Sequence, residues 1–129
     1  MRILLAILMW LSAGATHLSL GRDFRFFEPV QPRRAFQVMV HRGSALQAPE
    51  NTRQAILRSI EDGFEWVEVD VRLTRDGHHA LFHDSKLDGK TNSAGPLRER
   101  SLEELMQLDA GSWFAPRYSG ERLLTLKEW

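Results

Sequence analysis

The sequence predicts an α/β fold, namely the first two or three strands of a (β/α) barrel with their helices. Two strand-like segments, the apolar run 35–40 and the stretch 64–71, flank one amphipathic segment over 51–63. This order is a βαβ unit, and two parallel strands bury both of their faces only inside a larger sheet. Such barrels usually need about 250 residues. The 129 residues of this chain are therefore expected to be a truncated N-terminal part.

Residues 1–15 have the features of an export signal. Arg2 is their only charged side chain, residues 3–11 are uniformly apolar, and residues 13–15 (Ala-Gly-Ala) suit a signal peptidase. The apolar run is shorter than the roughly 20 residues of a membrane-spanning helix. We expect cleavage near Ala15 and an exported protein, periplasmic or extracellular. An uncleaved signal that anchors the protein in the membrane is the alternative.

The rest of the chain is expected to form an N-terminal arm over residues 16–34 and one domain over residues 35–129. Pro29 and Pro32 oppose a long helix in the arm. The run over 35–40 has the length and apolar character of a fully buried parallel strand, and it ends directly before His41.

A helix is predicted over residues 51–63, with Asn51 as a suitable N-cap and Gly63 placed to end it. One face of this helix carries, at helical spacing, Thr52, Ala55, Ile56, Ser59 and Ile60. The second strand is predicted over 64–71. A third extended piece, 79–83, follows the turn that Asp76-Gly77 predicts.

Two polar stretches, residues 85–100 and 109–122, are predicted to be loops. A capping box at residues 101–104 predicts a short helix between them, and a second capping box lies at residues 125–128.

The composition excludes several classes of function. Charge is balanced, with 17 basic and 17 acidic residues, so we expect no nucleic-acid partner. The absence of cysteine excludes disulfides, thiolate metal sites and a cysteine nucleophile. The sequence has no dinucleotide-binding fingerprint, Walker loop or nucleophile elbow.

Glu68 and Asp70 are two residues apart on the second predicted strand, so both side chains point to the same face. Neighbouring carboxylates in an otherwise apolar strand repel each other, and a divalent cation removes that repulsion. Oxygen ligands favour Mg²⁺ or Ca²⁺. The alternatives are ion pairs with Arg72 or Arg75, or simple exposure on an edge strand.

His41 and His83 each lie at the end of a predicted strand, where barrel enzymes hold catalytic groups. An imidazole serves as general acid or base near neutral pH. Arg42 offers a guanidinium fork for phosphate oxygens, and the glycine after it lets the backbone approach them. The alternative for Arg42 is an ion pair with Glu50 or Glu68.

Several motifs follow one another between residues 38 and 128: VMVHRG, APENT, EVDVRLTRDG, LFHD, LDGKTNSAGP and LDAGSWFAPRYSGERLLTLKE. In this order they resemble the glycerophosphodiester phosphodiesterase family. The resemblance implies a TIM barrel like that of phosphatidylinositol-specific phospholipases C. It also implies metal-dependent hydrolysis of a small glycerophosphodiester to glycerol 3-phosphate and an alcohol, in glycerophospholipid metabolism.

The resemblance assigns roles to individual residues. His41 and His83 match the general acid/base pair of the family, and Arg42 matches its phosphate-binding arginine. Glu68 and Asp70 match two ligands of its divalent metal, Ca²⁺ or Mg²⁺.

The resemblance also implies a reaction course and a longer protein. A glycerol hydroxyl attacks phosphorus, and water opens the resulting cyclic phosphate. Residues 85–120 match an inserted region near the active-site mouth, Leu124 replaces a usual proline, and a third acidic ligand and a lysine are expected beyond Trp129. The alternatives are a non-catalytic phosphate-binding or decayed remnant protein, and a lipase for sphingomyelin or inositol lipids. Contact with a membrane is expected only through the export signal or a lipid-derived substrate.

Overall fold

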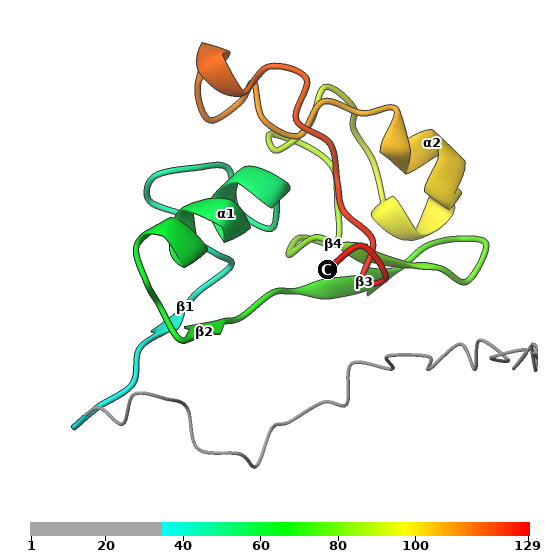
Figure 1. The fold of residues 1–129 in the computed structure, drawn as a ribbon. Coiled ribbons are helices and arrows are strands. Elements are labelled where there is room, and N and C mark those ends of the chain that lie inside the picture. Colours follow the sequence, from blue (N-terminus) through cyan, green and yellow to red (C-terminus); the bar gives the residue numbers. More distant parts are fainter. Residues whose placement is uncertain (1–34) are drawn as a thin grey trace, which may run out of the picture.

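The computed structural model describes residues 35–129, so the expected export signal (1–15) and N-terminal arm (16–34) lie outside the described residues. The strands are β1 (Met39–Val40), β2 (Trp66–Val67), β3 (Val71–Leu73) and β4 (His79–Leu81). The helices are α1 (Arg53–Glu61) and α2 (Leu102–Met106), with the 3₁₀ helices η1 (Leu97–Glu99) and η2 (Pro116–Tyr118). Figure 1 shows β1, β2 and α1 on the left and α2 above the β3–β4 hairpin on the right. None of the described helices has the length and apolar character needed to span a membrane.

The predicted βαβ unit is confirmed. β1 and β2 pair in parallel, with Met39 opposite Trp66 and Val40 opposite Val67, and α1 connects them. The second sheet holds only β3 and β4, which pair antiparallel. Residues 35–129 thus form an α/β unit that does not close into a barrel.

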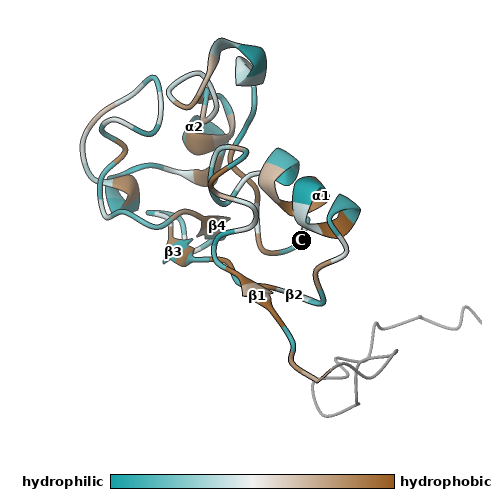
Figure 2. Cartoon of the chain, turned by 90° about the vertical axis from the view of Figure 1, so that its left-hand side faces the viewer, coloured by the Kyte–Doolittle hydropathy of each residue, from teal (hydrophilic) through white to brown (hydrophobic). Residues whose placement is uncertain are grey.

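The first strand is shorter and more exposed than the buried strand predicted over 35–40. Phe36 is 76% exposed and Met39 is 62% exposed. Among the described residues β1 has one neighbouring strand, so its apolar side chains keep contact with solvent. Figure 2 shows the brown, apolar colour of β1. The prediction of a fully buried strand is wrong for the described part of the chain.

Helix α1 is capped by Thr52 and not by Asn51, which corrects the predicted N-cap. The Thr52 hydroxyl accepts a hydrogen bond from the backbone N–H of Ala55. Asn51 has a left-handed φ of 58°, and its side chain donates a hydrogen bond to Asp70 instead. Burial of Thr52, Ala55, Ile56 and Ser59 confirms most of the predicted apolar face, but Ile60 is 63% exposed, which corrects its place there.

The strand predicted over 64–71 is divided into β2 and β3. The backbone N–H of Glu68 donates to the carbonyl of Val40, and β1 ends there. The chain then leaves β1 and pairs with β4 from Val71 onward, across the predicted turn at Asp76-Gly77. Residues 68–70 therefore lie between the two sheets, with Glu68 N bonded to the carbonyl of Val40 and the carbonyl of Asp70 bonded to Phe82 N.

Strand β4 separates two apolar clusters. Ala80 and Phe82 face one cluster and Leu81 faces the other, as expected for alternating side chains. The first cluster is completed by Leu87, Leu97, Leu105, Ala110 and Leu123. In the second cluster Leu81 packs with Ile56, Leu124, Val67 and Val69. The loop-rich segment after β4 is therefore anchored on one side of β4, and α1 on the other.

Both capping boxes form their reciprocal hydrogen bonds. Glu104 N donates to Ser101 Oγ, while Ser101 N donates to Glu104 Oε2. The same pair of bonds joins Thr125 and Glu128. The stretches 85–100 and 109–122 are mainly loops, as predicted, and each contains one 3₁₀ helix.

Asp109 organises the second of these loops. Its carboxylate accepts hydrogen bonds from the backbone N–H groups of Ser112, Gly120 and Gly111. These bonds hold the pKa of Asp109 far below its usual range. The ionised carboxylate thus replaces the regular hydrogen bonding that this loop lacks.

Asp109→Asn is expected to destabilise the protein at neutral pH, and less so in acid. Because the pKa is lowered in the folded state, the unfolded chain binds the proton first. The stabilisation is therefore fully present above about pH 4 and is lost as the pH falls toward the folded-state pKa. Urea unfolding at about pH 6 and about pH 3 measures this.

The difference in free energy of unfolding between wild type and Asp109→Asn should be smaller at about pH 3 than at about pH 6. Asp88→Asn is a matched control, because Asp88 accepts one backbone hydrogen bond, from Gly95. An equal difference at both pH values for Asp109→Asn would contradict the prediction.

Candidate active site

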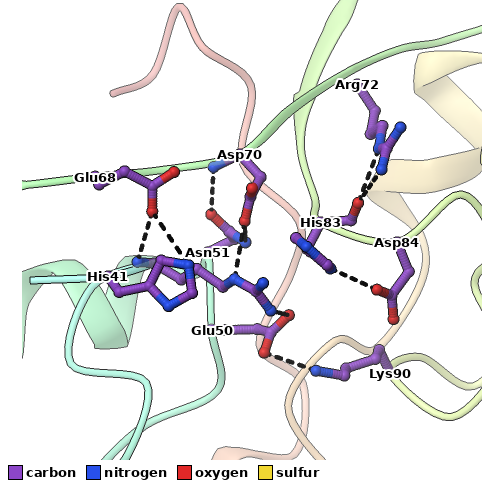
Figure 3. Close-up of polar contacts among 10 residues, drawn as sticks. His41, Glu50, Asn51, Glu68, Asp70, Arg72, His83, Asp84 and Lys90 are labelled. Atoms are coloured by element: carbon purple, nitrogen blue, oxygen red, sulfur yellow. Dashed lines mark hydrogen bonds and ion pairs between the residues drawn. The ribbon is translucent and has the colours of Figure 1, made fainter.

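The predicted site residues lie on three neighbouring segments. His41 and Arg42 directly follow β1, Glu68 and Asp70 lie between β2 and β3, and His83 lies just after β4. In the view of Figure 3, Asp70 and Glu50 lie between His41 and His83. The structure thus brings all five predicted residues into one region.

The chain turns sharply at Arg42, which has a left-handed φ of 56°. The backbone N–H of Arg42 donates to Glu68 Oε2 at 3.1 Å, and the backbone carbonyl of Arg42 accepts a hydrogen bond from Asn51 N at 3.0 Å. Gly43 follows with φ 74°, and a Cβ there would lie 2.8 Å from the Cβ of Ala55. A glycine is therefore needed because α1 packs directly against this turn.

The Arg42 guanidinium is held between two carboxylates. Nη1 donates to Glu50 Oε1 at 3.1 Å, and Nε lies 3.1 Å from Asp70 Oδ2. The orientation at Asp70 is too poor for a hydrogen bond, so the buried Nε–H has no hydrogen-bond acceptor among the described residues. The alternative of an ion pair with Glu50 is realised. The two carboxylates thus hold the guanidinium from two sides.

Glu68 and Asp70 each use one carboxylate oxygen within the described chain. Glu68 Oε2 accepts from Arg42 N and lies 3.9 Å from His41 Nε2. Asp70 Oδ2 accepts from Asn51 Nδ2 at 3.0 Å, and Asp70 N donates to Asn51 Oδ1 at 2.9 Å. No described residue donates a hydrogen bond to Glu68 Oε1 or Asp70 Oδ1.

The two imidazoles have different surroundings. The His41 side chain is 70% exposed and makes only the long contact with Glu68. His83 Nδ1 lies 2.6 Å from Asp84 Oδ1, in a hydrogen bond that fixes the ring. This bond, followed by attraction to Lys90, lowers the pKa of Asp84. Asp84 thus remains ionised near neutral pH and holds the His83 ring through Nδ1.

The suggested ion pairs of Glu68 or Asp70 with Arg72 or Arg75 are not formed. Arg72 Nε donates to the carbonyl of His83 at 2.9 Å, and its Nη2 donates to the same oxygen. Arg75 pairs with Glu104 at 3.2 Å. Arg72 therefore binds the backbone just after β4 and Arg75 binds α2, and neither pairs with Glu68 or Asp70.

Sequence reasoning assigned no site role to Asn51, Asp84 or Lys90. For Asn51 a signal existed, because Thr52 is also a good N-cap and leaves the asparagine side chain available. For Asp84 the signal was its position directly after His83 in the sequence. Lys90 Nζ lies 2.6 Å from Glu50 Oε2, and no local pattern in its polar loop predicts that contact.

The site has an excess of negative charge. Its carboxylates are Glu50, Glu68, Asp70 and Asp84, and its basic side chains are Arg42 and Lys90. Hard oxygen donors in excess over cations suit a divalent ion such as Mg²⁺ or Ca²⁺. Within residues 35–129 no group of three or more histidine and acidic side chains is arranged around a common point.

Comparison with known proteins points to one family. The model of the glycerophosphoryl diester phosphodiesterase family matches residues 41–129. A glycerophosphodiester phosphodiesterase from Caldanaerobacter subterraneus is 44% identical over 91 residues, which cover 70% of this chain and 37% of that protein. Glycerophosphodiester phosphodiesterase 1 from Mus musculus is 37% identical over 116 residues, which cover 81% of this chain and 35% of that protein.

Solved structures agree with the sequence comparison. A glycerophosphodiester phosphodiesterase from Agrobacterium tumefaciens has a TM-score of 0.70 and 37% identity, over 71% of this chain and 40% of that chain. A phosphodiesterase from Oleispira antarctica, in complex with the product sn-glycerol-3-phosphate, has a TM-score of 0.69 and 45% identity, over 70% of this chain and 37% of that chain. These similarities confirm the predicted fold class, an incomplete α/β barrel.

Proposed function

Because this chain belongs to the glycerophosphoryl diester phosphodiesterase family, we propose that the full-length protein hydrolyses glycerophosphodiesters to glycerol 3-phosphate and an alcohol. The chain spans 37% of the length of the Caldanaerobacter relative. The main support is the clustering of a guanidinium, two imidazoles and two carboxylates with unused oxygens. The product bound to the Oleispira phosphodiesterase supports a glycerol phosphate as ligand.

The two histidines are proposed to transfer the protons. One imidazole takes the proton from the attacking glycerol hydroxyl, and the other protonates the leaving alcohol. Asp84 holds the ring of His83 for this purpose. Arg42, held between Glu50 and Asp70, neutralises charge that develops on the phosphoryl oxygens. The first product is a cyclic phosphate, which water then opens.

Glu68 and Asp70 are proposed to hold a Mg²⁺ or Ca²⁺ ion through their unused oxygens. One or two carboxylates, completed by water and substrate oxygens, are an ordinary ligand set for Mg²⁺. When bound, such an ion would act as a Lewis acid on a phosphoryl oxygen. The hydrogen bonds from Asn51 and from Arg42 N orient these two carboxylates.

Removal of divalent metal is expected to abolish activity. The full-length protein is assayed for release of glycerol 3-phosphate from glycerophosphocholine, with and without excess chelator. Activity should disappear with chelator and return when Mg²⁺ or Ca²⁺ is added in excess of it. Full activity in chelator would reject the metal. Product binding without any hydrolysis would support the alternative, a non-catalytic phosphate-binding protein.

Two further proposals need separate tests. Intact sphingomyelin and inositol lipids in the same assay distinguish a lipase of this superfamily from a glycerophosphodiesterase. Export after cleavage near Ala15 is tested by determining the N-terminal residue of the mature protein in its cell fraction. A retained Met1 in the membrane fraction would support the anchored alternative.

A further inference from the structure

We propose that Lys90 is a positioning residue that acts on Arg42 through Glu50, an inference that rests on the proposed phosphate-binding role of Arg42. Lys90 Nζ lies 2.6 Å from Glu50 Oε2. The other oxygen of the same carboxylate, Oε1, accepts the hydrogen bond from Arg42 Nη1 at 3.1 Å. One carboxylate is thus shared by two cations that come from different parts of the sequence.

The shared carboxylate is shielded from water. The side chains of Arg42, Glu50 and Lys90 are 17%, 15% and 25% exposed. Charges in such surroundings interact more strongly than on an open surface, and salt screens them less. Loss of either cation therefore changes the interaction of Glu50 with the remaining one.

Lys90 is expected to weaken the hold of Glu50 on Arg42. With Lys90 in place, the negative charge of Glu50 is divided between two cations, and Arg42 keeps more of its positive charge for an anionic ligand. Without Lys90, Glu50 interacts with Arg42 alone and draws the guanidinium toward itself. The contact between Lys90 and Glu50 thus sets the orientation of the Arg42 guanidinium. It also sets how much of the positive charge of Arg42 remains for an anionic ligand.

Trp113 holds Lys90 in this position. The Lys90 ammonium lies 4.6 Å from the centre of the Trp113 ring, within cation–π range. The ring is fixed by a hydrogen bond from Trp113 Nε1 to the carbonyl of Ala110 at 2.8 Å. The cavity that Glu50, Lys90 and Trp113 help to line measures about 10 Å³, too small for a substrate group. The geometry thus favours an indirect role for Lys90 over direct contact with substrate.

The first test does not depend on activity. The Nε–H signal of Arg42 in nitrogen-15 NMR spectra, assigned by its loss in Arg42→Lys, reports the surroundings of the guanidinium. In Lys90→Met this signal should shift and exchange with water at a changed rate, and in Lys90→Arg it should stay near its wild-type position. Lys86→Met is the matched control, because Lys86 is exposed in the same loop. An Arg42 signal in Lys90→Met that equals the wild-type signal would overturn the proposal.

The second test uses affinity for sn-glycerol 3-phosphate, measured by calorimetry on the full-length protein. Lys90→Met should weaken binding about tenfold, on the scale of one charge-assisted hydrogen bond. Lys90→Arg should retain most of the affinity. In a Glu50→Gln background, Lys90→Met should have no further effect, because the intermediary charge is already absent.

The outcomes separate this proposal from the proposed function. If Lys90→Met weakens binding equally in the Glu50→Gln background, Lys90 acts directly on the ligand and the positioning role is wrong. If the wild-type protein neither binds the product nor hydrolyses a glycerophosphodiester, the proposed function fails. The NMR comparison still decides in that case whether Lys90 positions Arg42.

Discussion

His41→Ala is expected to lower the kcat of the full-length protein by at least about 10²-fold, the usual effect of losing a general acid or base. Its thermal stability should stay unchanged, because the side chain is 70% exposed and its one described contact, with Glu68, is 3.9 Å long. Release of glycerol 3-phosphate and a thermal unfolding curve measure the two effects.

His78→Ala is the matched control. Its imidazole is 58% exposed and lies 3.9 Å from Asp76, the same kind of contact as that of His41, but it lies in the turn before β4. This variant should keep wild-type turnover. Near-wild-type turnover of His41→Ala, or an equal loss in both variants, would reject the catalytic role of His41.

Asn51→Ala is expected to destabilise the protein by about 3 kcal/mol, since it removes one charged and one neutral hydrogen bond. The Asn51 side chain is buried, donates to Asp70 Oδ2 and accepts from Asp70 N. Alanine leaves Asp70 Oδ2 without this hydrogen-bond donor and Asp70 N without its acceptor. It also tolerates the left-handed backbone at this position less well than asparagine does. Urea unfolding measures the loss.

Asn92→Ala tests whether the effect depends on the position. Asn92 Oδ1 accepts a hydrogen bond from Asp109 N at 2.9 Å, which matches one half of the Asn51 interaction, but Asn92 is exposed. Its replacement should cost about 1 kcal/mol. Equal losses for the two variants would show that Asn51 has no special role in holding Asp70.

Asn51 also shows where sequence reasoning goes wrong at this site. The helix was predicted to begin at Asn51, because asparagine and threonine are both good N-caps. The structure selects Thr52, since the left-handed turn at Asn51 directs the amide toward Asp70. Asp70 belongs to a segment outside the helix, so no pattern within the helix distinguishes the two cap residues.

The strands show a second kind of limit. The sequence pattern predicted longer strands over 35–40 and 64–71, yet β1 and β2 are short. Strand length depends on the available partner, and β2 loses its partner where the chain turns at Arg42. Alternation along the strand, in contrast, is local. Val67 and Val69, which alternate with Glu68 and Asp70, pack with Ile56 and Leu81, whereas Val71, the next residue of this series, is 41% exposed.

The sequence by itself determined the α/β class, the order of strand, helix and strand, both capping boxes and the set of chemical groups at the site. These features are encoded in neighbouring residues through periodicity, turn chemistry and motif order. Only the tertiary structure decided that Glu50 is shared by Arg42 and Lys90 and that Asn51 holds Asp70. Such pairings depend on the distance between segments far apart in the chain, and that distance follows from how α1 and the loops pack around β4.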